Sequence, residues 1–179
     1  MNTEKLSTFE EVVERYGNFV YNVALRMTSD PVEAQDVTQE AFIDALRAWD
    51  RFRGDSQVST WLYRITVNRS LMRARKGKRE RQLVQGGVED REVVDWTQGP
   101  EQAAVSAELR GKLEEGLALL PEDLRAAVVL RDVQGLSSEE AARSLEITVA
   151  ALKARLHRGR VVLRKHLQDY VKATGEGAP

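Results

Sequence analysis

Apolar residues recur at helical spacing over most of this chain, and this periodicity constrains the fold more than any other feature. The first run extends from Phe9 to Met27 and places apolar side chains three or four residues apart, which predicts one long amphipathic helix. Valine pairs occur without the alternation of apolar and polar residues that marks a strand. The sequence therefore predicts an all-α fold.

Capping residues indicate where the next helices begin. Asp30 precedes Pro31, and Glu33 follows two residues later. These residues supply an N-cap, a proline at the first helical position and a carboxylate in the first turn. This second helix is expected to end near Asp50. A third is expected to begin near residues 59–60, after a glycine-containing loop, and to fade in the basic run that follows.

The C-terminal half contains a second group of predicted helices, over residues 108–120 and 122–134. Ser137 and Glu140 have the spacing of a capping box for a short helix, and Thr148 is the expected N-cap of the last one. A tight turn before a cationic second helix is typical of a DNA-binding helix-turn-helix, although generic antiparallel helix pairs share the pattern. The residues predicted to face outward from this last helix are Lys153, Ala154, His157, Arg158 and Arg160.

Between these two groups the periodicity breaks down. Residues 82–104 contain Gly86-Gly87 and Gly99-Pro100 and are rich in acidic side chains, a composition typical of an extended linker or a poorly ordered spacer. The prediction is two small helical domains, 1–81 and 105–170, joined by an extended acidic linker. The last residues, 171–179, are expected to be a disordered tail.

Composition excludes several classes of function. The 179 residues include no cysteine and only two histidines, which excludes disulfide frameworks and thiol nucleophiles and leaves little capacity to bind a metal. Of the histidines, His157 is expected to face DNA and His166 to be solvated near the helix end. No apolar run reaches transmembrane length, and the N-terminus lacks the pattern of a signal peptide. We expect a soluble cytoplasmic protein without metal or cofactor and without direct membrane insertion.

Charge is distributed in blocks, although the net charge is only −1. Residues 30–44 carry only acidic charges, residues 64–81 almost only basic ones, and residues 148–167 only basic ones. Alternating blocks predict different partners for different surfaces.

Residues 52–70 combine an adaptable loop, aromatic side chains and cations. The loop contains Arg53, Gly54, Asp55 and Ser56 after Phe52, and the helix behind it carries Trp61 and Tyr63, then Asn68, Arg69 and Arg73. Aromatic surface beside a polar loop suits an unstacked base, and the cations suit a phosphate backbone. The segment therefore predicts binding to nucleic acid that has been opened. Trp61 could equally stack on DNA or belong to the core.

The second predicted helix carries a polar stripe of its own. Asp36, Gln39, Glu40 and Ile43 fall at i, i+3, i+4 and i+7, so they share one face. An acidic face is usually only solvated, but the glutamine and isoleucine within it favour a partner helix. Asp36 and Glu40 could also form a catalytic carboxylate pair, but no histidine, phosphate loop or nucleophile elbow accompanies them. The sequence therefore predicts no enzyme.

Three segments together resemble the extracytoplasmic-function (ECF) group of sigma factors, within the sigma-70 family of RNA polymerase subunits. They are AQDVTQEAFIDA at 34–45, FRGDSQVSTWLYRITVNRS at 52–70 and the segment from Leu120 to Arg160. They resemble the core-polymerase-binding helix, the promoter-melting and minus-ten-reading segment, and the domain that reads the minus-thirty-five element. The resemblance covers almost the whole chain.

The resemblance implies roles for individual residues. Asp36, Gln39, Glu40 and Ile43 would dock on the clamp helices of the largest polymerase subunit. Phe52, the loop from Arg53 to Val58, and Asn68 would capture and read a flipped minus-ten base. In the last helix, Lys153, Ala154, His157 and Arg158 would meet minus-thirty-five DNA, with Arg155 and Arg160 on phosphates. His157 and the Ala150-Ala151 pair depart from residues common in the family, which bears on base preference.

Partners follow from the same resemblance. They are core RNA polymerase, including the flap of the second-largest subunit, promoter DNA, and an anti-sigma factor that could hold the protein at the membrane. The function implied is an alternative sigma factor that directs polymerase to promoters and assists their melting. The alternative is a stand-alone helix-turn-helix regulator that binds an operator. It would account for residues 137–160 but not for the acidic stripe or the aromatic segment.

Overall fold

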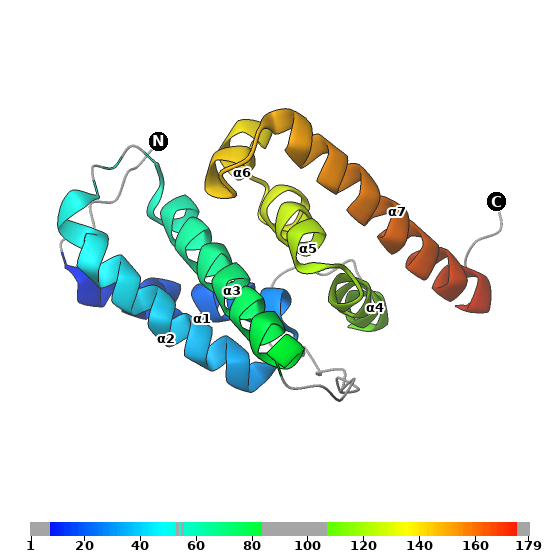
Figure 1. Ribbon diagram of the computed structural model, residues 1–179, viewed down its shortest axis with the longest axis horizontal. Helices are drawn as coiled ribbons and strands as arrows, with labels where there is room; N and C mark the ends of the chain where they lie inside the picture. The colour runs from blue at the N-terminus through cyan, green and yellow to red at the C-terminus, as the bar shows by residue number, and fades with distance from the viewer. Residues whose placement is uncertain (1–7, 53, 55, 84–106, 175–179) are drawn as a thin grey trace. The chain divides into compact units, whose positions relative to one another are not determined.

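The computed structural model of the chain describes residues 8–52, 54, 56–83 and 107–174. Within these ranges the chain is helical with no strand, which confirms the all-α prediction. It divides into two compact units, one before and one after residue 90 (Figure 1). Most of the predicted linker lies outside the described residues, as do the last five residues of the predicted tail. The predicted domain limits stay predictions, but helix continues to Thr174, four residues into the expected tail.

The described residues of the N-terminal unit form three long helices and one short turn. They are α1 (Phe9–Thr28), α2 (Pro31–Ala48), the 3-10 turn η1 (Trp49–Arg51) and α3 (Val58–Leu83). Asp30 caps α2 as predicted, since its carboxylate accepts hydrogen bonds from the backbone N–H groups of Val32 and Glu33 at 2.8 and 3.0 Å. The buried core cluster comprises Val12, Val20, Ala41, Ala45 and Leu62.

In the part of the C-terminal unit that the structure describes, residues 107–174, there are four helices and a π-helical turn. They are α4 (Ala107–Ala118), α5 (Glu122–Val128), the turn η2 (Val129–Val133), α6 (Ser138–Ser144) and α7 (Val149–Thr174). Leu152 and Leu156 of α7 are buried, as their helical spacing predicts. They share this core with leucines of α5 and η2, so α7 is anchored by its inner face and exposes the opposite one.

Capping residues fix the two helices of the predicted helix-turn-helix. Ser137 Oγ accepts a hydrogen bond from the Glu140 N–H at 3.1 Å, and a Glu140 carboxylate oxygen accepts one from the Ser137 N–H at 2.9 Å. These two bonds lower the pKa of Glu140 below its ordinary value, the backbone bond most. At the start of α7, Thr148 Oγ1 accepts a hydrogen bond from the Ala151 N–H at 3.1 Å. Both predicted caps are confirmed, and the start of α7 is thereby defined.

Two glycines let α7 approach its neighbours closely. A Cβ at Gly159 would lie 2.9 Å from a methyl group of Val128 in α5, and one at Gly116 of α4 would lie 2.8 Å from Leu163 of α7. His166 packs beside Gly116, with its Nε2 3.6 Å from a carboxylate oxygen of Glu115 and 23% of its side chain exposed. The prediction of a solvated His166 was therefore wrong, because α4 covers this end of α7.

No helix among the described residues is both long and apolar enough to cross a membrane.

Candidate functional site

A ladder of ion pairs joins the acidic stripe of α2 to the basic face of α3. Arg73 donates from Nη2 to Asp36 Oδ2 at 2.7 Å, and Arg69 donates from Nε to Asp44. Glu40 lies between them, 3.6 Å from Arg73 and 3.8 Å from Arg69. The bond to Asp44 is the main reason that the pKa of Arg69 is raised above its ordinary value. Two sets of residues that the sequence assigns to different partners are thus in direct contact.

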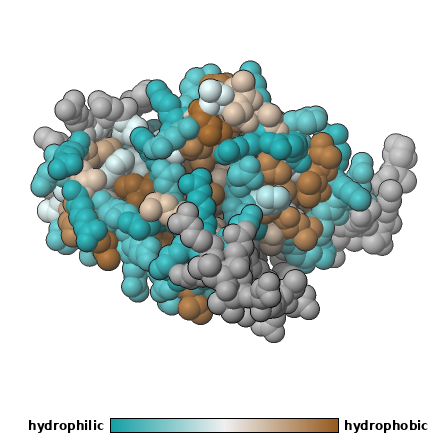
Figure 2. Space-filling model, in the orientation of Figure 1, coloured by the Kyte–Doolittle hydropathy of each residue, from teal (hydrophilic) through white to brown (hydrophobic). Residues whose placement is uncertain are grey.

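The α2 stripe consequently has two parts. Its carboxylates, Asp36 and Glu40, turn toward α3 and keep 49% and 43% of their side chains exposed. Gln39 and Ile43 are exposed away from the core, and Leu46, which the sequence analysis did not select, is also exposed. Figure 2 shows hydrophobic residues scattered among hydrophilic ones on the visible face of the molecule. The exposed isoleucine and leucine give α2 an apolar surface beside its carboxylates.

Aromatic rings surround the start of the loop before α3. Phe52 stacks on Trp49 with ring centroids 5.9 Å apart and an interplanar angle of 10°, and it lies 4.8 Å from Trp61. Trp61 packs against the core cluster while remaining partly exposed. Both the core and the stacking interpretations of Trp61 therefore have a structural basis: one part of the ring is buried and the rest borders Phe52.

Other residues of this segment differ in how available they are to a ligand. Asn68 is half-buried on α3, and Gly54 is exposed with a positive φ of 74° that suits glycine. Ser56 is exposed, whereas Arg53 and Asp55 lie outside the described residues. Tyr63 is buried against Phe19, and burial raises its pKa to about 12. The prediction that Tyr63 contributes aromatic surface was therefore wrong, because its side chain belongs to the core.

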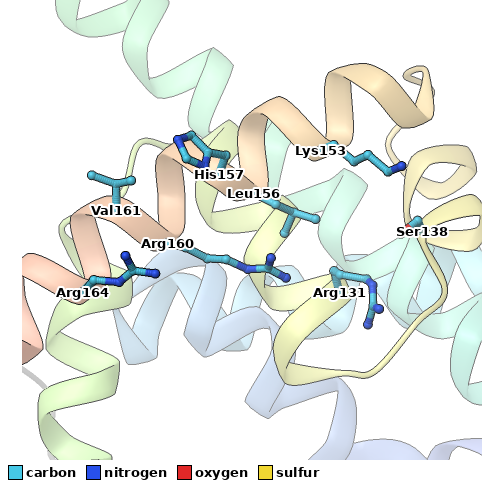
Figure 3. A pocket seen from close by; sticks show the side chains of 8 residues that line it. All are labelled: Arg131, Ser138, Lys153, Leu156, His157, Arg160, Val161 and Arg164. Atoms are coloured by element: carbon cyan, nitrogen blue, oxygen red, sulfur yellow. The ribbon is translucent and has the colours of Figure 1, made fainter.

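The outward face of α7 borders a surface groove of about 370 Å³. Figure 3 shows Lys153 extending from α7 toward Ser138, and Arg160 extending toward Arg131. The lining residues include four cationic side chains and a histidine but no carboxylate; they are Arg131, Ser138, Lys153, Leu156, His157, Arg160, Val161 and Arg164. The groove is therefore a cationic surface suited to an anionic ligand.

The cations of α7 differ in their contacts. Arg160 forms a bidentate pair with Asp132 at 2.6 and 2.9 Å, which raises its pKa, and Arg155 lies 3.5 Å from Asp123. Arg158 is exposed, and its Nε donates to the Ala154 carbonyl of its own helix at 3.4 Å. The predicted outward residues Lys153, Ala154, His157, Arg158 and Arg160 are all exposed, as expected, and Arg155 is partly buried.

Four groove residues were not predicted from the sequence: Arg131, Ser138, Val161 and Arg164. Arg131 belongs to η2 and Ser138 begins α6, so neither lies on α7; Arg164 follows one turn after Arg160. The spacing of Arg164 from Arg160 could have revealed it. Arg131 could not be found in this way, because only the fold brings η2 beside α7.

Among the residues that the structure describes, no group of three or more histidine and acidic side chains could hold a metal ion. The two units instead present a mixed polar and apolar surface on α2, an aromatic cluster with cations on α3, and a cationic groove at α7.

Comparison with known proteins identifies the family. The family model for sigma-70 region 2 matches residues 12–80, and that for sigma-70 region 4 matches residues 110–163. The ECF RNA polymerase sigma factor SigW of Bacillus subtilis (strain 168) is 36% identical over 167 residues, covering 90% of this chain and 89% of the relative. The chain belongs to the ECF group of RNA polymerase sigma factors. The ECF RNA polymerase sigma-E factor of Escherichia coli (strain K12) is 35% identical over 174 residues, covering 92% and 88%.

Solved structures show the same fold. The sigma factor RpoE of Bartonella quintana, crystallised with the anti-sigma factor NepR, matches with a TM-score of 0.72 and 24% identity over 89% of this chain and 96% of that one. CnrH, in complex with the cytosolic domain of CnrY, matches with a TM-score of 0.57 and 25% identity over 90% and 88%. As an ECF sigma factor, the protein is a transcription initiation factor of a family that is not enzymatic, and the stand-alone regulator is the weaker interpretation.

Proposed function

We propose that this sigma factor docks on core RNA polymerase through α2, captures an unpaired minus-ten base beside Phe52 and Asn68, and reads the minus-thirty-five element with α7. The observation that carries the proposal is the cationic groove along α7, which no carboxylate lines. An α-helix fits the major groove of DNA, where its outward side chains can reach base edges. Lys153, His157 and Arg158 are exposed on that face.

The α3 region suits single-stranded DNA better than a duplex. Extruding a base costs a few kcal/mol, and stacking with hydrogen bonds to the base edge offsets that cost. Phe52 and Trp61 supply partly exposed aromatic surface, and Asn68 supplies an amide that can both donate and accept. The exposed residues of the loop, Gly54 and Ser56, can approach such a base closely.

The partners are those of a sigma factor. The α2 surface would contact the clamp helices of the largest polymerase subunit, and the C-terminal unit would contact the flap of the second-largest one. The sigma factor RpoE, which has the same fold, is seen in complex with the anti-sigma factor NepR, and CnrH, also of the same fold, is seen in complex with the cytosolic domain of CnrY. An anti-sigma factor for this chain, membrane-anchored or free, is part of the proposal, as is a cytoplasmic location.

Charge reversal on α2 should weaken assembly with core polymerase. Asp36→Lys/Glu40→Lys replaces two half-exposed carboxylates at the proposed docking surface. We expect at least a tenfold loss of affinity for core polymerase, because two complementary charges become repulsive. Titration of labelled protein with core enzyme measures the change.

Two further variants separate docking from damage to the α2–α3 ladder. Gln39→Ala/Ile43→Ala leaves the ion pairs in place and should also weaken assembly, whereas Glu10→Lys/Glu14→Lys, on the exposed side of α1, should not. Wild-type affinity in both α2 variants would remove α2 from the docking surface. Co-purification of the wild-type protein with core polymerase provides the first test of the function as a whole.

Base reading and phosphate binding by α7 should respond differently to mutation. If exposed Arg158 contacts a guanine, Arg158→Ala should cost about 1–3 kcal/mol and relax preference at one base pair. If DNA displaces the Asp132 carboxylate from Arg160, Arg160→Ala should weaken binding to all sequences and reduce the salt dependence by about one phosphate contact. Selection of minus-thirty-five sequences by each holoenzyme measures both effects. Retention of every base preference by Arg158→Ala would reassign Arg158 to a phosphate.

A further inference from the structure

Arg73 is held by the same carboxylates that are proposed to dock on polymerase. Its two ion-pair partners within the described residues are Asp36, at 2.7 Å, and Glu40, at 3.6 Å. About a third of the Arg73 side chain is exposed, so a ligand can reach it. Arg73, which is proposed to contact DNA, is therefore paired with two carboxylates that are proposed to contact polymerase.

Arg69, one turn away on the same face of α3, has a different environment. Its main partner is Asp44, which lies outside the proposed docking set, and Glu40 is only a distant second at 3.8 Å. Loss of Asp36 and Glu40 to another partner would leave Arg69 bonded to Asp44. The same loss would leave Arg73 without either of its α2 carboxylates.

A guanidinium that is paired with carboxylates is a poor ligand for a phosphate, because binding the phosphate requires the pair to break. Ion pairs between partly exposed side chains are weak enough for a competing cation to displace. A protein surface that brings cations to Asp36 and Glu40 therefore competes directly with Arg73 for these carboxylates. Arg73 therefore exchanges between a state paired with Asp36 and Glu40 and a released state, and a ligand shifts this equilibrium toward the state that it binds more tightly.

We propose that Arg73 is a DNA contact gated by polymerase docking: α2 carboxylates hold it in the free sigma factor, and docking releases it to the phosphate backbone of the minus-ten strand. This inference rests on the proposed function. Arg69 stays on Asp44 in both states and keeps its position. Because coupling between two binding sites is reciprocal, promoter DNA also strengthens the hold of polymerase on α2.

Neutralising the two carboxylates should mimic docking in the isolated protein. Asp36→Asn/Glu40→Gln removes both partners of Arg73, and binding of a labelled single-stranded minus-ten oligonucleotide should tighten about threefold to fivefold. The plot of log affinity against log salt should steepen by about 0.7, the value for one additional phosphate on a single strand. Fluorescence anisotropy over a salt series measures both quantities on the full-length chain.

Two matched variants exclude a general effect of charge. Glu10→Gln/Glu14→Gln removes the same two charges from the exposed side of α1 and should leave the salt slope unchanged. When Arg73 is already replaced by alanine, neutralising Asp36 and Glu40 should also leave the salt slope of DNA binding unchanged. Equal steepening with and without Arg73 would overturn the proposal. The proposal would also be overturned if Asp36→Asn/Glu40→Gln lost thermal stability without any gain in DNA binding. That result is expected if the ion pairs only stabilise the packing of α2 against α3.

Assembled holoenzyme separates this inference from the proposed function. At saturating core polymerase, Arg73→Ala should bind a pre-melted promoter more weakly than the wild-type protein does. If Arg73→Ala has no effect there, the proposed DNA role of this face of α3 fails. If Arg73→Ala has its effect but carboxylate neutralisation leaves the free protein unchanged, only the gating fails.

Discussion

Replacing Leu152 with alanine is expected to destabilise the C-terminal unit by about 2–5 kcal/mol. Leu152 is fully buried at 0% exposure in the core that joins α7 to α5 and α6. Truncation removes buried methyl groups and leaves a cavity, and both effects oppose folding. Small domains have only about 5–15 kcal/mol of total stability, so much of it would be lost. Hydrogen exchange followed by mass spectrometry measures each unit separately.

The neighbouring residue provides the control. Lys153→Ala changes an exposed side chain of α7 and should alter stability by less than about 0.5 kcal/mol. Both variants should lose minus-thirty-five binding, Leu152→Ala through unfolding and Lys153→Ala with the fold intact. Peptides from α1 to α3 should keep their wild-type protection in both. Unchanged protection of α7 in Leu152→Ala would show that the core tolerates the cavity.

The helix starts were predictable where a capping side chain accepts hydrogen bonds from backbone N–H groups close by in the sequence. Asp30, Ser137 and Thr148 each accept hydrogen bonds from backbone N–H groups two or three positions ahead, so the sequence alone contains both partners. Helical periodicity likewise predicted which side of α7 faces the core. These interactions are local, and sequence spacing determines them.

Long-range electrostatics were not predictable in the same way. Arg73 and Asp36 are 37 residues apart, and Arg160 and Asp132 are 28 apart. The sequence shows only a basic block and an acidic block, which suggested separate surfaces for separate partners. The packing of α3 against α2 instead brings the two blocks together, so most of the ladder's charge is paired internally.

Aromatic residues show the same limit. Trp61 and Tyr63 are two positions apart on α3 and so point to different sides of the helix, but their spacing does not show which side faces the core. In the structure, Tyr63 packs on Phe19 in the core, whereas Trp61 is partly exposed beside Phe52. Tyr63 is buried because α1 places Phe19 against it. His166 was misjudged for a related reason, since glycine at position 116 lets α4 cover it.

Removing Phe52 and Asn68 is expected to impair promoter opening far more than formation of the closed complex. Each alanine replacement should cost about 1–3 kcal/mol of binding to the melted strand, the usual cost of losing one stacking or base-edge contact. The double variant Phe52→Ala/Asn68→Ala should lose more than either single one. Permanganate footprinting of open complexes measures the effect on a duplex promoter and on a pre-melted one.

The aromatic cluster requires a control for packing, because Phe52 stacks on Trp49 as well as facing the loop. Phe52→Leu keeps most of the apolar volume but removes the ring, so it should preserve the fold and still open promoters poorly. Asn68→Ala, by contrast, removes a half-buried amide without changing the cluster. Base capture predicts that both defects persist on the pre-melted template, where the strand is already exposed. A defect confined to the duplex would mean that these side chains assist melting and do not hold the base, because a capture site must bind the strand however it was opened.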